Sequence, residues 1–149
     1  MSYIQSIYFE FGSGCVLPTT GILWQSRGVS FSLDRDATNP LAPGRKPFHT
    51  LNPPLARFDD GRIMSYGAMG GDGQPQTQAA LFTRYILQGV PLQESISRPR
   101  WLLGRTWGQT SDSLKLEGRF TPQSVARLRA LGHEVEVLDD FSEAMGHTG

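Results

Sequence analysis

One helix that is apolar around most of its circumference constrains this fold more than any other segment. Pro75 suits a first helical turn, the helix body covers residues 76–88, and Gly89 stands where a C-terminal cap belongs. Three polar residues fall on one narrow stripe: Thr77, Arg84 and Gln88. A helix so widely apolar is expected between layers of structure, so the sequence predicts packing partners on several of its sides.

The segments before this helix have the composition of strands and turns. Residues 3–11 and 21–25 are rich in β-branched and aromatic types, and we predict a strand in each, the first ending in the glycine turn at residues 12–14. Residues 34–46 hold two prolines and scattered charges, which is typical of a surface loop. The sequence Asp59-Asp60-Gly61 predicts a hairpin that joins residues 55–58 to 62–67.

The segments after the long helix alternate between helix and strand. We predict a short helix over residues 91–98 and a strand over residues 113–117. A further helix starts at its N-cap Thr121 and ends at Gly132, with one apolar face made by Val125, Leu128 and Leu131. Residues 133–137 alternate as a half-buried strand does. The whole order indicates an α+β layered domain.

Composition excludes several functional classes. The chain has 149 residues, with 14 Lys and Arg against 14 Asp and Glu, so it has no basic stripe for nucleic acid. No apolar run reaches the roughly 20 residues that span a membrane, and the start does not resemble a signal peptide. The three histidines lack the spacing of a metal site, and we expect no cofactor. A single cysteine, Cys15, weakly favours a reducing compartment such as the cytoplasm.

Two groups of residues could carry chemistry. Four glycines, at positions 67, 70, 71 and 73, lead into the long helix, where backbone N–H groups favour a phosphate, a carboxylate or an oxyanion. Such a pattern more often marks an ordinary structural turn than an anion-binding site. Arg100 and Arg105 bracket two tryptophans, Trp101 and Trp107, and such arginines either pack on indole or hold a carboxylate. No Gly-x-Ser-x-Gly elbow supports a serine hydrolase.

Six motifs, read in order, carry a specific resemblance. They are Ile4-Gln5-Ser6 with Phe11-Gly12-Ser13-Gly14, Gly21-Ile22-Leu23, the run Asn39 to Pro47, Met69-Gly70-Gly71, Arg98-Pro99-Arg100 and Leu116-Glu117-Gly118. Together they resemble the small subunit of the gamma-glutamyltransferase family over nearly the whole chain. The run from Gly70 to Gln76 is most similar to the acylase-like and oxamate-amidohydrolase-like branch.

The resemblance implies part of a four-layer αββα N-terminal-nucleophile hydrolase fold, formed by autocleavage of a precursor. Residues 1–149 would be a single partial domain that lacks the strand carrying the nucleophilic threonine and the last strands. In that family the threonine attacks an amide carbonyl and its own α-amine acts as base. The implied partners are a small-molecule amide substrate and the large-subunit segment of the same precursor.

The resemblance also implies roles for individual residues. Gly70 and Gly71 match the glycine pair whose N–H groups form the oxyanion hole. His49 and Thr50 occupy the place of two hydroxyl residues that hold the substrate's carboxylate, and Ser6 lies near a substrate-supporting asparagine.

Two positions depart from the transpeptidase pattern. Ser30 stands where an aspartate binds the donor's ammonium, and Arg27 stands at a nearby glutamine position. A cation there repels an ammonium and attracts a carboxylate. We therefore expect cleavage of an amide of a carboxylated acyl group, with oxamate and glutaryl-like acids as candidates.

Two other hypotheses belong to different classes. The chain could be a catalytically inactive truncated domain with only binding or association activity. It could also be a small-anion-binding domain that uses the helix start near Pro75. Because an isolated half would expose apolar sheet faces, we also expect self-association as a homodimer.

Overall fold

The computed structural model describes residues 2–105 and 111–148. The chain divides into two compact units, one made of Met1–Ser2 with Asn52–Gly149 and the other of Tyr3–Leu51. Among the described residues, the α-helices and the paired strands belong to the first of these units.

The unit Tyr3–Leu51 is built from turns, not from strands. It holds a 3-10 helix at Arg27–Ser30 and two isolated bridges, Val16 with Leu23 and Ser32 with Pro40. The predictions of strands over residues 3–11 and 21–25 are therefore wrong. A strand needs a neighbour along its length, and here left-handed φ angles at Tyr8 (83°) and Phe11 (56°) turn the chain instead.

Other predictions for this unit are confirmed. The chain turns at residues 12–14, where Gly12 and Gly14 have φ angles of 57° and 73°. Residues 34–46 form a loop without a helix or strand of their own.

The unit that begins at Asn52 opens with the predicted hairpin. Strands β1 (Leu55–Arg57) and β2 (Ile63–Ser65) pair antiparallel, with Ala56 opposite Met64. Gly61 takes a φ of 85° in the connecting turn, a conformation that glycine adopts without steric cost.

The long helix follows a short strand and a tight turn. Strand β3 (Ala68–Met69) leads into a 3-10 turn (Gly71–Gly73) and α1 (Gln74–Phe82), which continues as a π-helical segment (Thr83–Leu87). The prediction of a widely apolar helix, buried on several sides, is partly wrong. The buried face of α1 is largely polar: Gln74, Thr77, Gln78 and Leu81. Leu87 is 72% exposed. The polar side chains are tolerated inside where they find partners, as the Gln78 amide does by donating to the Asn52 carbonyl at 2.8 Å.

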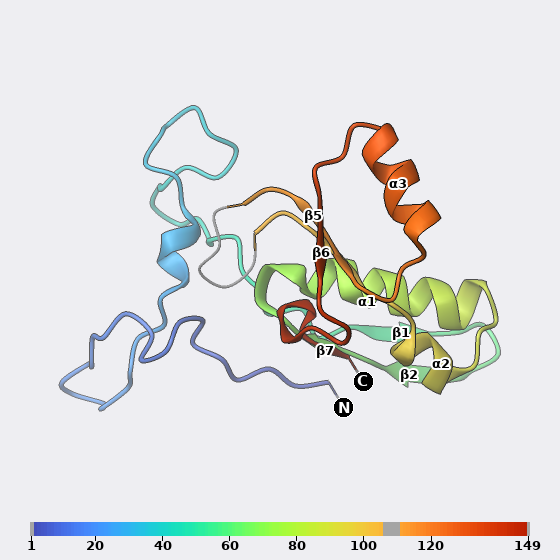
Figure 1. The fold of residues 1–149 in the computed structure, drawn as a ribbon. Coiled ribbons are helices and arrows are strands. Elements are labelled where there is room, and N and C mark those ends of the chain that lie inside the picture. The colour runs from blue at the N-terminus through green and yellow to red at the C-terminus, as the bar shows by residue number, and fades with distance from the viewer. Residues whose placement is uncertain (1, 106–110, 149) are drawn as a thin grey trace. The chain divides into compact units, whose positions relative to one another are not determined.

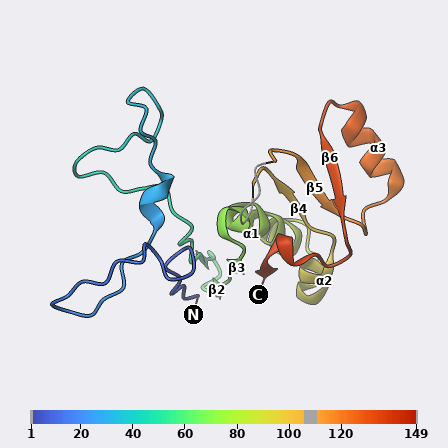
Figure 2. The same cartoon turned by 60° about the vertical axis from the view of Figure 1, so that its left-hand side comes forward.

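A three-stranded sheet forms the other half of this unit. After α2 (Leu92–Ser97), strand β4 (Trp101–Leu103) pairs antiparallel with β5 (Leu114–Glu117), and β5 pairs parallel with β6 (Val135–Leu138). Figure 1 shows the sheet on one side of α1, and Figure 2 shows that β4 is the strand nearest to α1 and β6 the farthest. The connecting helix α3 (Pro122–Ala130) lies next to β6, as Figure 2 shows. As predicted, the Thr121 side chain caps α3 by accepting from the Ser124 N–H. Leu131, expected on the apolar face, is instead 70% exposed.

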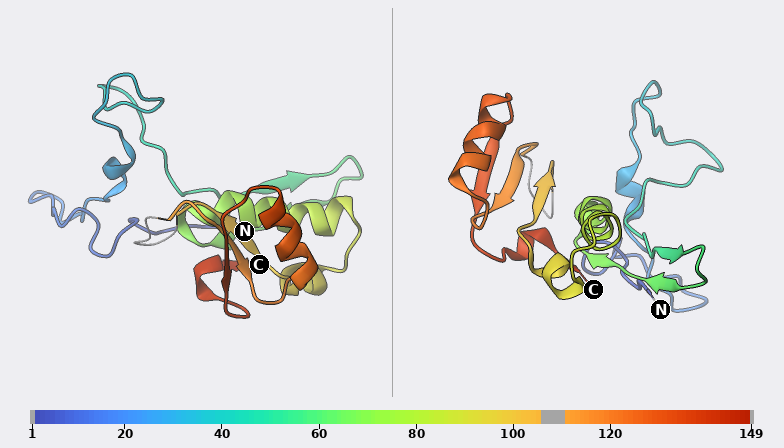
Figure 3. Two further views of the ribbon diagram at one scale, coloured as in Figure 1. Left: turned by 45° about the horizontal axis from the view of Figure 1, so that its top comes forward. Right: turned by 90° about the vertical axis from the view of Figure 1, so that its right-hand side faces the viewer.

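Helix α1 lies along the free edge of β4, where Figure 3 shows it end-on. The Gln76 side chain bonds both backbone groups of Leu103, accepting from its N–H at 2.8 Å and donating to its carbonyl at 2.9 Å. The glutamine side chain thus bonds the edge of β4 as a neighbouring strand would.

The last described residues of the chain pair with β3. A 3-10 turn (Glu143–Met145) precedes β7 (His147–Thr148), which pairs antiparallel with β3, Met69 lying opposite His147. The buried apolar side chains come from α1, the loop before α2, β4, β5 and this turn: Leu81, Val90, Leu102, Leu114, Leu116 and Met145. Mixed helices and sheets confirm the predicted α+β class. None of the described helices is long and apolar enough to cross a membrane.

Candidate functional site

The glycine pair Gly70–Gly71 forms a left-handed turn between β3 and α1. Gly70 has a φ of 149° and Gly71 a φ of 53°, and the Gly73 N–H closes the turn by donating to the Gly70 carbonyl at 3.0 Å. Among the described residues, the Gly71 N–H has no hydrogen-bond acceptor. An unused N–H at the start of a helix suits an anion or an oxyanion.

The backbone of Gly146 packs directly against this turn. A Cβ atom on Gly70 would lie 3.2 Å from the Gly146 Cα, and a Cβ on Gly146 would collide with the Met69 carbonyl oxygen. Gly146 also has a φ of 69°. Close packing of two backbones therefore requires glycine on both sides, so the turn's position depends on the segment before β7.

The predicted substrate residues Arg27 and Ser6 contact each other within the unit Tyr3–Leu51. The Arg27 side chain, 3% exposed, donates from Nη2 to the Ser6 hydroxyl at 2.7 Å and from Nη1 to Gln25 Oε1 at 2.8 Å. Its guanidinium also lies over the Tyr8 ring, 5.8 Å from the ring centre. The two residues thus form one polar cluster.

The charge of Arg27 has no counter-ion among the described residues. No Asp or Glu of residues 2–105 and 111–148 forms an ion pair with it, and its buried Nε has no hydrogen-bond partner there. Burial lowers the pKa of Arg27 from its ordinary value. A buried cation with an unused donor is costly unless an anion pairs with it.

The remaining predicted residues lie in the same unit, and within the described part of the chain no hydrogen bond joins them to the Arg27 side chain. Ser30 ends the 3-10 helix that Arg27 begins, and its carbonyl accepts from the Asn39 side chain at 3.1 Å. His49 is exposed, and its Nδ1 accepts from the Leu51 N–H at 3.2 Å, whereas Thr50 is buried. The roles of these residues stay predictions.

Arg100 holds a carboxylate, the second of the two alternatives that the sequence left open. Its Nη2 lies 2.6 Å from Oε1 of Glu117, and Arg119 contacts the other oxygen of the same carboxylate at 2.6 Å. Within the described residues no arginine lies over Trp101, and Trp107 falls outside them. The sequence indicated the arginine as a candidate but not its partner Glu117, which lies 17 residues later at the end of β5.

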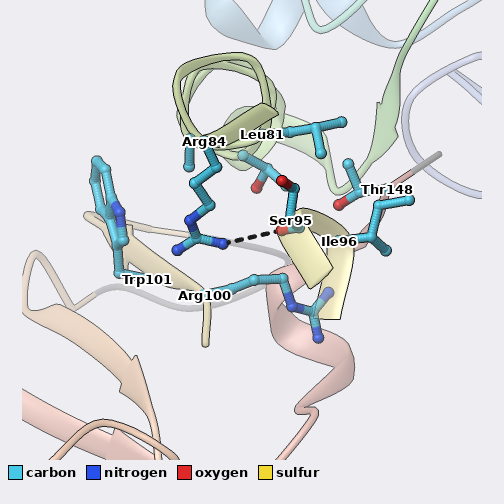
Figure 4. Close-up of a pocket in the computed structure, with 9 residues that line it drawn as sticks. Leu81, Arg84, Ser95, Ile96, Arg100, Trp101 and Thr148 are labelled. Carbon is cyan, nitrogen blue, oxygen red and sulfur yellow. Dashed lines mark hydrogen bonds between the residues drawn. The ribbon is translucent and has the colours of Figure 1, made fainter. Parts of the chain in front are cut away.

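A small cavity adjoins this ion cluster. It measures about 10 Å³, close to the space that one water needs, and its lining includes Arg84, Ser95, Arg100 and Thr148. Figure 4 shows Arg84 reaching toward Ser95, whose carbonyl it bonds at 3.3 Å, with Arg100 beneath it. No three His, Cys, Asp or Glu residues in the described part of the chain gather closely enough to hold a metal ion.

The family model for gamma-glutamyltranspeptidase matches residues 1–148. The chain belongs to this family. It is 78% identical to the oxamate amidohydrolase proenzyme of Klebsiella pneumoniae, over all of this chain and 28% of that protein. It is 47% identical to the glutathione hydrolase-like YwrD proenzyme of Bacillus subtilis, over 98% of this chain and 28% of that protein. The chain thus spans under a third of the length of these relatives.

Solved structures have a similar fold. The cephalosporin acylase from Bacillus halodurans superposes with a TM-score of 0.78 at 35% identity, covering 97% of this chain and 26% of the acylase. A gamma-glutamyltranspeptidase from Pseudomonas nitroreducens gives 0.70 at 19% identity, covering 98% and 79%. The predicted membership of the N-terminal-nucleophile hydrolases is thereby confirmed, with this chain as a part of that fold.

Proposed function

We propose that this chain is the substrate-binding part of a precursor-derived amidohydrolase that cleaves an amide next to a carboxylated acyl group. Its partners in this proposal are the large-subunit segment of the same precursor and an upstream strand that begins with the nucleophilic threonine. Family membership and proenzyme relatives support this over a truncated domain with only binding activity.

The observation that carries the proposal is the buried charge of Arg27, for which residues 2–105 and 111–148 supply no counter-ion. Its Nη groups donate to Ser6 and Gln25, which hold the guanidinium in one orientation, while Nε finds no acceptor within the described part of the chain and can donate to an anion. A fixed guanidinium suits a carboxylate and repels the ammonium of a γ-glutamyl donor. The 78% identical relative is named for oxamate, which has a carboxylate directly beside its amide.

The reaction follows from the family's chemistry. The threonine hydroxyl attacks the amide carbonyl, its α-amine takes the hydroxyl proton, and the N–H groups of Gly70 and Gly71 stabilise the resulting oxyanion. The C–N bond then breaks, and the amine leaves with that proton. Water hydrolyses the acyl-enzyme ester and releases the acid. For oxamate the products would be ammonia and oxalate.

The first test is a comparison of substrates on two proteins. The precursor-length protein, in which this chain is joined to the upstream segments proposed above, should hydrolyse oxamate or a glutaryl amide faster than a γ-glutamyl anilide. The 149-residue chain alone should turn over none of the three, because the proposal places the nucleophile outside it. Faster cleavage of the anilide would overturn the proposed acyl specificity, and turnover by the chain alone would overturn the proposed nucleophile.

Replacing Arg27 with glutamine should lower kcat/KM for oxamate by roughly a hundredfold, since a desolvated ion pair to the substrate is lost. The matched control is Arg35→Gln, an exposed arginine of the same unit. The decisive measurement is the ratio of kcat/KM for oxamate to that for oxamide, which carries no carboxylate. A folding defect lowers both values together, so an unchanged ratio would contradict the assignment of Arg27.

A further inference from the structure

A buried carboxylate with two arginines lies at the end of the central strand β5. Glu117 is 0% exposed and accepts from Arg100 Nε at 3.0 Å and Nη2 at 2.6 Å, and from Arg119 Nη2 at 2.6 Å. Burial would raise the pKa of Glu117, but these hydrogen bonds outweigh it and hold the pKa below its ordinary value. Buried ion clusters of this kind contribute little net stability compared with apolar packing, so they are often retained for another reason.

Arg100 links this ion cluster to a distant part of the chain through hydrogen bonds. While Nε and Nη2 bind Glu117, Nη2 also donates to the Ser142 carbonyl at 3.2 Å, and Nη1 donates to the Gly146 carbonyl. Ser142 and Gly146 flank the 3-10 turn that precedes β7. One planar guanidinium thus fixes both ends of that turn, and a lysine ammonium lacks the fork to do the same.

The position of Arg100 is itself fixed from a second direction. Arg84, from the π-helical segment after α1, donates to the Pro99 carbonyl at 2.7 Å and to the Ser95 carbonyl at 3.3 Å. The Arg100 N–H donates to the Glu117 carboxylate at 2.9 Å. The backbone and the side chain of Arg100 are therefore both held in place. This fixes where its guanidinium contacts the segment around Gly146.

Gly146 connects this network to the glycine pair. Its Cα would be 3.2 Å from a Cβ on Gly70, and the strands on either side, β3 and β7, pair with each other. Any movement of the Gly146 backbone therefore acts on the Gly70–Gly71 turn, because no side chain lies between them to absorb it.

We propose that Arg100, anchored by Glu117, is a positioning residue that sets the geometry of the Gly70–Gly71 turn through the backbone of Gly146. The inference rests on the proposed function in so far as the turn forms the oxyanion hole. It assigns Arg100 no contact with substrate.

The test compares Arg100→Lys with Arg98→Lys in the precursor-length protein. Arg98 lies nearby in the sequence and its side chain forms an exposed ion pair with Glu94 at 2.6 Å, so it is a matched control. With Arg100→Lys, kcat per active site, counted by acyl-enzyme titration, should fall by about tenfold to a hundredfold, because small misplacements cost that much. KM should change by less than about threefold, since an oxyanion hole acts mainly in the transition state.

A second readout does not depend on activity. Hydrogen exchange of the peptide over residues 68–74, which contains the bonded Gly73 amide, should become about tenfold faster with Arg100→Lys and stay unchanged with Arg98→Lys. Equal kcat and equal exchange in the two variants would overturn the positioning role. An inactive wild-type protein would instead overturn the proposed function, and the exchange measurement would still decide the role of Arg100.

Discussion

Replacing Gly70 with alanine is expected to lower the kcat of the precursor-length protein about a hundredfold, the range found when one oxyanion-hole donor is lost. The φ of 149° at Gly70 is one that residues with a Cβ rarely adopt, and the new Cβ would press on the Gly146 Cα at 3.2 Å. Either the turn or the β7 segment must shift, and both movements displace the Gly71 N–H. Steady-state kinetics on oxamate, normalised to titrated active sites, measure the effect.

Gly61→Ala provides the matched control for this experiment. Gly61 also has a left-handed φ, 85°, but a Cβ there meets no atom within 4 Å and the turn belongs to the β1–β2 hairpin. Both variants should lose roughly 1–2 kcal/mol of stability from backbone strain. Only Gly70→Ala should lose kcat, and equal kcat values for the two variants would contradict an oxyanion role for this turn.

The parts of the fold that the sequence predicted are those set by local chemistry. Thr121 and Gly132 mark the ends of α3 because a side-chain cap and a left-handed glycine act within one turn of the helix. Asp59-Asp60-Gly61 marks the hairpin for a similar reason. The strands expected over residues 3–11 and 21–25 failed because β-branched composition says nothing about whether a neighbouring strand exists.

In the candidate site too, the sequence indicated which residues take part but not the contacts that their side chains make. The resemblance selected Arg27 and Ser6, and the structure brings their side chains to 2.7 Å. Neither composition nor spacing indicated that Arg27 is buried with no counter-ion among the residues that the structure describes. The polar inward face of α1 was missed because the predicted polar stripe left out Gln78 and the predicted helix body began after Gln74. Their burial depends on groups far along the chain, such as the Asn52 carbonyl.

Glu117→Gln is expected to destabilise the chain strongly, by about 3–5 kcal/mol at pH 7. The amide keeps the shape of the side chain but removes the charge between Arg100 and Arg119, so two partly buried guanidinium groups lose their counter-ion. Urea titrations of the wild-type chain and the variant measure the difference in free energy of unfolding. Glu94→Gln, which removes an exposed ion pair, should cost no more than about 0.5 kcal/mol.

The effect of Glu117→Gln should also depend on pH in a defined direction. Because the pKa of Glu117 in the folded chain is below its ordinary value of 4.5, the carboxylate stabilises the fold fully above that pH. This contribution is lost as the pH falls through the folded-state pKa, where the wild-type side chain becomes neutral like glutamine. The difference between wild type and variant should therefore shrink in titrations at about pH 4 and about pH 3. A difference that stays constant from neutral pH down to this range would show that the loss comes from packing and not from the charge that anchors Arg100.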